Sequence, residues 1–256
     1  MRFHRVRVVR KLPHPGRAFT QGIIADGSTI WESSGKYGQS ALRRYRLGSD
    51  KASAQAELEA ELFGEGIFRV GDSIWQLTWR ERVALRWDAD TLELRDKITY
   101  NRAGWGMCTV GGFADDRGQL TPLEVVTSDG TSELVRRDPR TLEPGPVVHV
   151  RCHGQRVPGL NDLTWAGGLV WANVAGTDCL AGIDLDTGEV TDVVDARAAT
   201  EHVWRDPQAI MNGITALAQP GEFLLTGKEW RSIREVGLVP DRDRGHVDRL
   251  LAGLSR

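Results

Sequence analysis

A glutamate between two glycines is the residue of this sequence best placed to do chemistry. Glu65 lies in the stretch FGEGI, residues 63–67, and 44 residues earlier Gln21 occupies the same place in FTQGI, residues 19–23. Each of the two is followed ten positions later by a tryptophan. The flanking glycines would let a substrate approach the side chain closely. A carboxyl group held in this way could act as a general acid or base.

Further copies of the motif place polar or aromatic residues at the equivalent point. Aligning the copies selects Gln21, Glu65, Trp105, Asn161 or Asp162, and Asn212. If the repeats were arranged in a ring, these side chains would surround one opening. Two interpretations stay open from the residues alone: a ligand site, or side chains that satisfy main-chain groups at the mouth of a channel.

The elements that must position these residues are short strands separated by turns. A turn followed by a β-rich run recurs about every 50 residues, at 26–35, 71–79, 118–130, 167–176 and 221–230. Three repeats continue into the turns DADTLE, DPRTLE and DLDTGE, which begin at Asp88, Asp138 and Asp184. Asp favours such turns because it accepts hydrogen bonds from the main chain that follows it. The pattern predicts an all-β chain that forms a five-bladed β-propeller. A β-sandwich would not require fivefold recurrence.

The five repeats predict a single domain over residues 1–256, with a charged C-terminal tail from about residue 240. The segment RVRVV, residues 5–9, is expected to pair with the last blade and close the ring, which would leave no free sheet edge. We therefore expect a monomer. Trp31, Trp75 and Trp171 lie in the middle of strands and are expected to pack between blades.

Composition argues against several classes of partner. The chain has 33 Lys and Arg against 35 Asp and Glu, and no basic block, so nucleic acid is not an expected partner. No run of roughly 18 apolar residues predicts a membrane span. The start of the chain lacks a signal-peptide core, so a cytoplasmic location is expected for the sequence as given. Cys108, Cys152 and Cys179 are odd in number and widely spaced, which predicts buried structural thiols.

Motifs along the chain resemble those of the plant and bacterial glutaminyl-peptide cyclotransferases, the papaya glutaminyl cyclase family. They occur in the family's order between residues 17 and 232: FTQGI, ESSGKYGQSALRRY, FGEGI, WQLTW, GWGM, VPGLNDLTW, MNGI and LLTGKEW. The resemblance implies a five-bladed propeller that converts an N-terminal glutaminyl residue of a peptide or protein to pyroglutamate, with release of ammonia. The reaction requires no cofactor, and propellers can hold a structural cation in the central channel, so that alternative stays open. The resemblance also leads us to expect exported relatives.

The resemblance assigns roles residue by residue. The catalytic polar groups would be Gln21, Glu65, Asn161 and Lys228, with Glu65 as the general acid/base. The aromatic wall that binds the substrate would be Phe19, Phe63, Trp79 and Trp105. The sequence departs from the family at Ala175, where a second tryptophan commonly follows WANV, so substrate preference and turnover are expected to differ.

The chemistry of cyclisation explains these residue types. The α-amine and the γ-carboxamide of the substrate belong to one residue, so attack is intramolecular. Glu65 would carry a proton from the amine to the leaving nitrogen, and burial among aromatic rings would raise its pKa. Lys228, Gln21 or Asn161 would donate to the developing oxyanion. Two alternatives remain: a propeller that only binds peptide N-termini, and a metal-dependent lactonase or esterase that uses Glu65, Asn161 and Asn212. The cyclase hypothesis needs no metal ligand.

Overall fold

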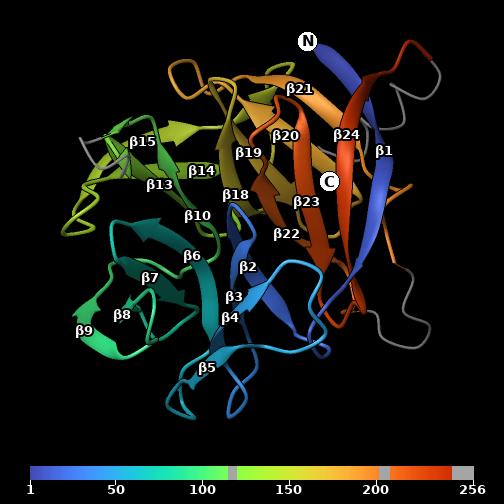
Figure 1. Cartoon of the computed structure of the whole chain (residues 1–256). Helices are drawn as coiled ribbons and strands as arrows, with labels where there is room; N and C mark the ends of the chain where they lie inside the picture. Colours follow the sequence, from blue (N-terminus) through green and yellow to red (C-terminus); the bar gives the residue numbers. More distant parts are fainter. Residues whose placement is uncertain (115–119, 202–207, 244–256) are drawn as a thin grey trace.

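The regular structure of this protein is β-strand throughout the residues that the computed structural model describes, 1–114, 120–201 and 208–243 (Figure 1). The predicted all-β class is confirmed. In the same ranges no helix is long and apolar enough to cross a membrane. Most of the strands lie in antiparallel groups of four.

Three of these groups are separate four-stranded sheets. The first comprises β2 (Thr20–Asp26), β3 (Thr29–Ser34), β4 (Ala41–Arg46) and β5 (Ala54–Glu57). The second comprises β6 (Gly64–Val70), β7 (Ser73–Thr78), β8 (Val83–Asp88) and β9 (Leu94–Thr99). The third comprises β10 (Met107–Val110), β13 (Glu124–Ser128), β14 (Glu133–Arg137) and β15 (Pro144–His149). Two small hairpins are formed by β11 (Phe113–Ala114) with β12 (Leu120–Thr121) and by β16 (Arg151–Cys152) with β17 (Gln155–Arg156).

The remaining strands form one eight-stranded sheet in the order β18-β19-β20-β21-β1-β24-β23-β22. Its first half comprises β18 (Leu160–Ala166), β19 (Leu169–Val174), β20 (Cys179–Ile183) and β21 (Val190–Asp195). Its second half comprises β22 (Met211–Ala216), β23 (Glu222–Gly227), β24 (Ser232–Pro240) and the N-terminal strand β1 (Arg2–Pro13).

The N-terminal strand joins the two halves of this sheet. β1 pairs antiparallel with β24, with Arg5 opposite Val239, and this confirms the predicted pairing of RVRVV with the last repeat. The same strand pairs in parallel with β21, from Arg2 opposite Asp192 onward. The start of the chain therefore completes the last group and also covers the edge of the group before it (Figure 1).

The first strand of each group faces the middle of the molecule. β2 contacts β6 and β22, β10 contacts β6 and β18, and β18 contacts β22, so these five strands form a closed cycle. Figure 1 shows them around the centre, with the other strands of each group farther out. Residues at the starts of these five strands can therefore meet at one end of the cycle.

Apolar side chains fill the spaces between neighbouring groups. Trp31 of the first sheet packs with Ile67, Leu85 and other residues of the second. Trp75 lies in a cluster with Met107 of the third sheet, and the Trp171 and Phe223 rings are 5.3 Å apart. The predicted packing role of Trp31, Trp75 and Trp171 is confirmed.

The three predicted Asp turns are also confirmed. In each, one side-chain oxygen of Asp88, Asp138 or Asp184 accepts hydrogen bonds from the main-chain N–H groups two and three residues later, at 2.7 to 3.0 Å. The turn then requires a left-handed residue, which is Gly188 in the third copy, with a φ of 74°, and a leucine in the other two, for example Leu92 with a φ of 59°. The turns end the third strand of each group and start the fourth.

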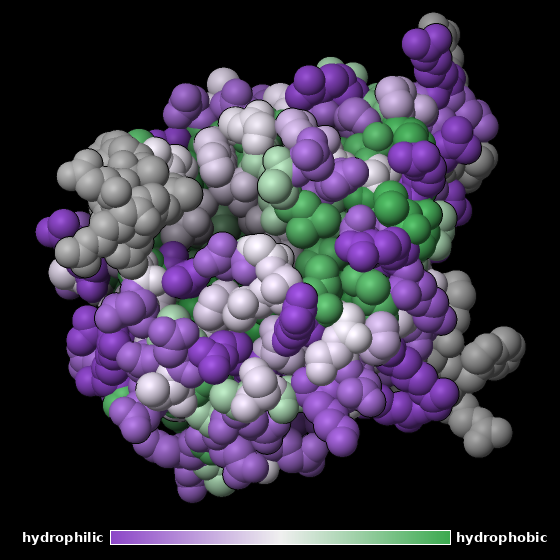
Figure 2. All heavy atoms as spheres, in the orientation of Figure 1, coloured by the Kyte–Doolittle hydropathy of each residue, from purple (hydrophilic) through white to green (hydrophobic). Residues whose placement is uncertain are grey.

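The fourth strands β9 and β15 lie at the surface of the described molecule. Most side chains of β9 and β15 are exposed, and Figure 2 shows hydrophilic atoms over the region of β5, β8 and β9. The three cysteines are buried and free, as predicted. The predicted C-terminal tail follows the end of β24 at Pro240, and its residues 244–256 lie outside the described ranges.

A buried carboxylate fixes the first sheet behind the strand that carries Gln21. Glu32 accepts hydrogen bonds from Thr20 Oγ1 at 2.6 Å, from His14 Nε2 at 2.8 Å and from Arg43 Nη2 at 2.8 Å. Burial raises the pKa of the Glu32 carboxyl, but His14 and Arg43 outweigh burial and lower this pKa to about 2. Glu32 therefore stays ionised and holds Thr20, the residue before Gln21, in place.

Candidate active site

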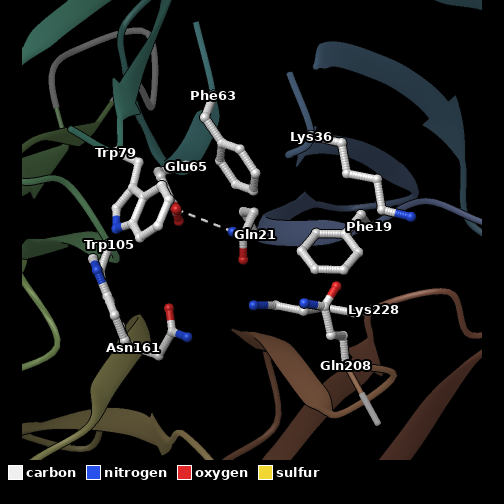
Figure 3. A pocket seen from close by; sticks show the side chains of 10 residues that line it. All are labelled: Phe19, Gln21, Lys36, Phe63, Glu65, Trp79, Trp105, Asn161, Gln208 and Lys228. Atoms are coloured by element: carbon white, nitrogen blue, oxygen red, sulfur yellow. Dashed lines mark hydrogen bonds between the residues drawn. The ribbon is translucent and has the colours of Figure 1, made fainter. Parts of the chain in front are cut away.

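One pocket, with a volume of about 250 Å³, gathers all eight side chains that the sequence selects as site residues (Figure 3). Its lining comprises Phe19, Gln21, Lys36, Phe63, Glu65, Trp79, Trp105, Asn161, Gln208 and Lys228. Sequence reasoning did not select Lys36 and Gln208. The structure thus brings the expected residues together from positions more than 200 residues apart in the chain.

Two sets of positions in the repeats supply five of the ten lining residues. The polar residues Gln21, Glu65 and Asn161 each stand second in the first strand of their group, in β2, β6 and β18. Trp79 and Lys228 each directly follow the second strand of their group, β7 and β23. Because second strands run antiparallel to first strands, their ends return to the same end of the cycle.

Glu65 has one oxygen in a hydrogen bond and one directed at the pocket. Gln21 Nε2 donates to Glu65 Oε1 at 3.0 Å. No described residue donates a hydrogen bond to Oε2, and Glu65 lines the pocket (Figure 3). The carboxyl group is therefore fixed at one oxygen and available to a ligand at the other.

The pKa values of Glu65 and Lys228 are shifted in opposite directions. Burial raises the pKa of the Glu65 carboxyl well above its ordinary value; Lys228 lowers it, and the carboxylates of Glu81 and Asp162 raise it further. Burial also lowers the pKa of the Lys228 ammonium, which Glu65 opposes. The pKa of Glu65 is raised and that of Lys228 is lowered, and perturbed pKa values of this kind are typical of groups that exchange protons in active sites.

Aromatic rings form the wall around these charges. The Phe19 and Phe63 rings meet edge to face at 6.2 Å, and the Phe63 and Trp79 rings lie 5.6 Å apart. The ammonium groups of Lys36 and Lys228 each lie 4.8 Å from the centre of the Phe19 ring. This cation–π geometry holds the lysines against the wall while leaving their N–H groups able to donate.

The glycines beside Glu65 serve a purpose different from the one that the sequence suggests. They were expected to let substrate approach, but their hydrogens face the neighbouring chain. A Cβ on Gly64 would lie 2.8 Å from the Ser34 carbonyl oxygen, and a Cβ on Gly66 would lie 2.6 Å from the Trp105 carbonyl oxygen. The Gly66 N–H also donates to that Trp105 oxygen at 2.7 Å. The glycines therefore allow adjacent sheets to come close, and that expectation is wrong.

Lys36, a lining residue that the motifs did not predict, pairs with Glu229. Both residues adopt left-handed backbone conformations, with φ angles of 92° and 63°. Such conformations are unfavourable for residues with a Cβ and often mark functional positions. The pair links the end of β3 to the end of β23 on either side of Phe19.

Asn161 has a hydrogen-bond acceptor that is free for a ligand, whereas Ala175 does not line the pocket. Asn161 Oδ1 is buried and has no hydrogen-bond partner among the described residues. It can therefore accept from a ligand that enters the pocket. Ala175, where the family resemblance leads one to expect tryptophan, donates its N–H to the Gly159 carbonyl at 2.8 Å and does not line the pocket.

No group of three or more His, Cys, Asp or Glu side chains is arranged to hold a metal ion in the described ranges. The side chains that line the pocket supply one carboxyl group, two ammonium groups, three side-chain amides and four aromatic rings.

Comparison with known proteins agrees with this geometry. The family model described as "Glutamine cyclotransferase" matches residues 1–238. The chain belongs to the glutamine cyclotransferase family. A glutaminyl-peptide cyclotransferase of Arabidopsis thaliana is 29% identical over 242 residues, which cover 93% of this chain and 72% of the relative. The crystal structure of Myxococcus xanthus glutaminyl cyclase matches with a TM-score of 0.83 and 30% identity, and the match covers 94% of this chain and 99% of that one.

The resemblance inferred from the motifs is therefore confirmed, and this member of the glutamine cyclotransferase family carries its candidate residues in a single pocket. The individual roles of Gln21, Glu65, Asn161 and Lys228 stay predictions.

Proposed function

We propose that this protein is a glutaminyl-peptide cyclotransferase, which converts the N-terminal glutaminyl residue of a peptide or protein to pyroglutamate and releases ammonia. The observation that carries the proposal is the buried Glu65 carboxyl group, with one free oxygen, beside Lys228 in an aromatic pocket. Family membership and the likeness to a glutaminyl cyclase structure support the same reaction.

In the proposed mechanism, Glu65 Oε2 takes a proton from the substrate α-amine as the amine nitrogen attacks the γ-carboxamide carbon. A C–N bond forms, and the carbonyl oxygen takes up negative charge. When this oxyanion collapses, the bond to the amide nitrogen breaks, and Glu65 returns the proton to that nitrogen, which leaves as ammonia. A carboxyl group in this role contributes about 10²- to 10⁴-fold in rate.

The other polar groups divide the remaining tasks. Asn161 Oδ1, which has no partner among the described residues, is positioned to accept a hydrogen bond from the α-amine. Lys228, whose ammonium lies against Phe19, is the donor best suited to the oxyanion, and its positive charge favours the neutral, reactive form of the amine. The aromatic walls exclude water, which would otherwise compete with the amine to give glutamate.

The scaffold we propose is a five-bladed β-propeller, in which the four-stranded groups are the blades and β1 closes the ring with β24. The closed cycle of β2, β6, β10, β18 and β22 supports this count. We further propose a monomer without nucleic-acid or membrane partners, since the pairing of β1 covers sheet edges and the formal net charge is −2.

The decisive experiment measures ammonia release and the matching loss of mass from a short peptide with N-terminal glutamine. Wild type and Glu65→Gln are compared with and without a metal chelator. Chelator-resistant cyclisation that falls by about 10² or more in Glu65→Gln is the expected result. Binding of the peptide without turnover would favour a binding protein, and loss of activity with chelator would favour a metal-dependent hydrolase; either outcome would overturn the proposal.

A further inference from the structure

Gln21 holds Glu65, and a second amide outside the pocket lining holds Gln21. Asn212 stands second in β22, where Gln21 and Glu65 stand second in β2 and β6. Its Nδ2 donates to Gln21 Oε1 at 3.0 Å and to the main-chain carbonyl oxygen of Thr20 at 3.1 Å. Asn212 is fully buried and does not line the pocket, so it touches Glu65 only through Gln21.

The direction of this chain of hydrogen bonds is set at its Thr20 end. A main-chain carbonyl can only accept, so the Asn212 amide must turn its Nδ2 toward Thr20. In that orientation Asn212 Oδ1 is buried without a partner among the described residues. The two hydrogen bonds that Nδ2 donates therefore determine the orientation of the Asn212 amide. Gln21 Oε1 then faces a donor, and Gln21 Nε2 must face Glu65.

We propose that Asn212 is a positioning residue that fixes the Gln21 amide so that Glu65 Oε1 always meets an N–H donor and the proton is carried on Oε2. A hydrogen bond donated to a carboxylate oxygen stabilises the negative charge on that oxygen, so the other oxygen is the more basic of the two. Glu65 Oε2, the oxygen that faces the pocket, is thereby the one that exchanges protons with the substrate. The inference rests on the proposed function and adds a residue to it.

Loss of Asn212 should change both the rate of cyclisation and its dependence on pH, because both depend on Glu65. In Asn212→Ala the Gln21 amide is free to rotate, and a misplaced group at a reacting centre can cost up to about 10² in rate. A hydrogen bond to a carboxylate lowers its pKa, so weakening the Gln21 bond raises the pKa of Glu65. The charged and titratable groups that act on Glu65, which are Lys228, Glu81 and Asp162, are unchanged in this variant.

The test is a double-mutant cycle with Gln21→Ala, Asn212→Ala and the double variant, measured as kcat and KM for a glutaminyl peptide across pH. We expect Asn212→Ala to lower kcat by about tenfold or more with little change in KM, and to move the acidic limb of the kcat/KM profile to higher pH. The double variant should be no worse than Gln21→Ala, because Asn212 acts through Gln21. Losses that multiply would overturn the proposal.

Asn173→Ala is the matched control. Asn173 is a buried asparagine, and its Oδ1 accepts a hydrogen bond from the Gly213 N–H at 3.1 Å. Gly213 directly follows Asn212 in the chain. Asn173→Ala should lower stability without the loss of kcat or the shift in pH profile. An equal loss of kcat in Asn173→Ala would mean that Asn212 has only a structural role.

A second measurement does not depend on turnover. Titration of the Glu65 carboxyl carbon by NMR should show a raised pKa in both Gln21→Ala and Asn212→Ala and no change in Asn173→Ala. An unchanged Glu65 pKa in Asn212→Ala refutes the inference even if wild type is active. Inactive wild type with the expected pKa shifts would refute the proposed reaction and leave the positioning role of Asn212 supported.

Discussion

Replacing Glu65 with glutamine should make the folded protein more stable near neutral pH, although it removes the proposed proton carrier. Burial raises the pKa of the Glu65 carboxyl above that of the same group in the unfolded chain. A carboxyl group whose pKa is higher in the folded than in the unfolded chain contributes fully to stability below its pKa in the unfolded chain, about 4.5. That contribution is lost as the pH rises through the pKa in the folded chain. Glutamine has the same shape, can still accept from Gln21 through its amide oxygen, and does not ionise.

The size of the effect follows from proton linkage. Between pH 4.5 and the folded pKa of Glu65, wild type should lose up to about 1.4 kcal/mol of unfolding free energy per pH unit relative to Glu65→Gln. For a chain of this length each kcal/mol corresponds to roughly 2–4 °C in Tm. The Lys228 ammonium, which lowers the pKa of Glu65, limits how far the difference grows.

Urea denaturation of both proteins at intervals from pH 4 to 7.5 measures this difference. The two unfolding free energies should coincide at pH 4 and diverge as the pH rises, with Glu65→Gln the more stable. Glu93→Gln, at an exposed carboxyl in the turn between β8 and β9, controls for the change from carboxyl to amide and should run parallel to wild type. Parallel curves for wild type and Glu65→Gln would refute the argument that burial raises the pKa of this carboxyl group.

Three further changes test the site and its scaffold. Lys228→Met should raise the pKa of Glu65, move the acidic limb of the kcat/KM profile to higher pH and lower kcat by about 10²-fold, as steady-state assays across pH will show. Gly66→Ala should lower the urea unfolding free energy by about 1–3 kcal/mol because its Cβ would meet main-chain atoms, whereas Gly237→Ala, with nothing within 4 Å, should not. Glu32→Gln should cost about 3–5 kcal/mol at pH 7, since it leaves buried positive partners unpaired. Because the Glu32 pKa is lowered to about 2, wild type should keep this contribution above pH 4.5 and lose it only as the pH falls toward 2.

The sequence predicted the features that depend on local pattern. The Asp turns at Asp88, Asp138 and Asp184 are local, because the side chain bonds to the main chain two and three residues on. A polar residue stands second in four of the five first strands, and this recurrence led from Gln21 to Glu65, Asn161 and Asn212. In the third group the aligned residue is Trp105, which precedes β10. Because the motif is repeated, these positions could be predicted from the sequence without knowledge of long-range contacts.

Features that depend on contacts between sheets could not be predicted from the sequence. The reason for Gly66 lies in the Trp105 carbonyl of the next sheet, which no local pattern reveals. Lys36 could have been found near the end of a second strand, because it lies two positions after β3, and Trp79 and Lys228 directly follow β7 and β23. Gln208 precedes β22 by three positions, outside the repeated motif, and carries no such signal.

Two buried carboxyl groups with raised pKa values lie on the cycle of first strands, and hydrogen bonding distinguishes them. Burial raises the pKa of Asp162, and the main-chain N–H groups of Ile214, Leu163 and Ile23 oppose that shift. These bonds commit Asp162 to joining neighbouring strands, and it does not line the pocket. Glu65 receives its hydrogen bond from a side chain, at one oxygen, and keeps the other for the pocket. The charge on Asp162 raises the pKa of Glu65, so the carboxyl group that closes the scaffold also helps to tune the one that can exchange protons with a substrate.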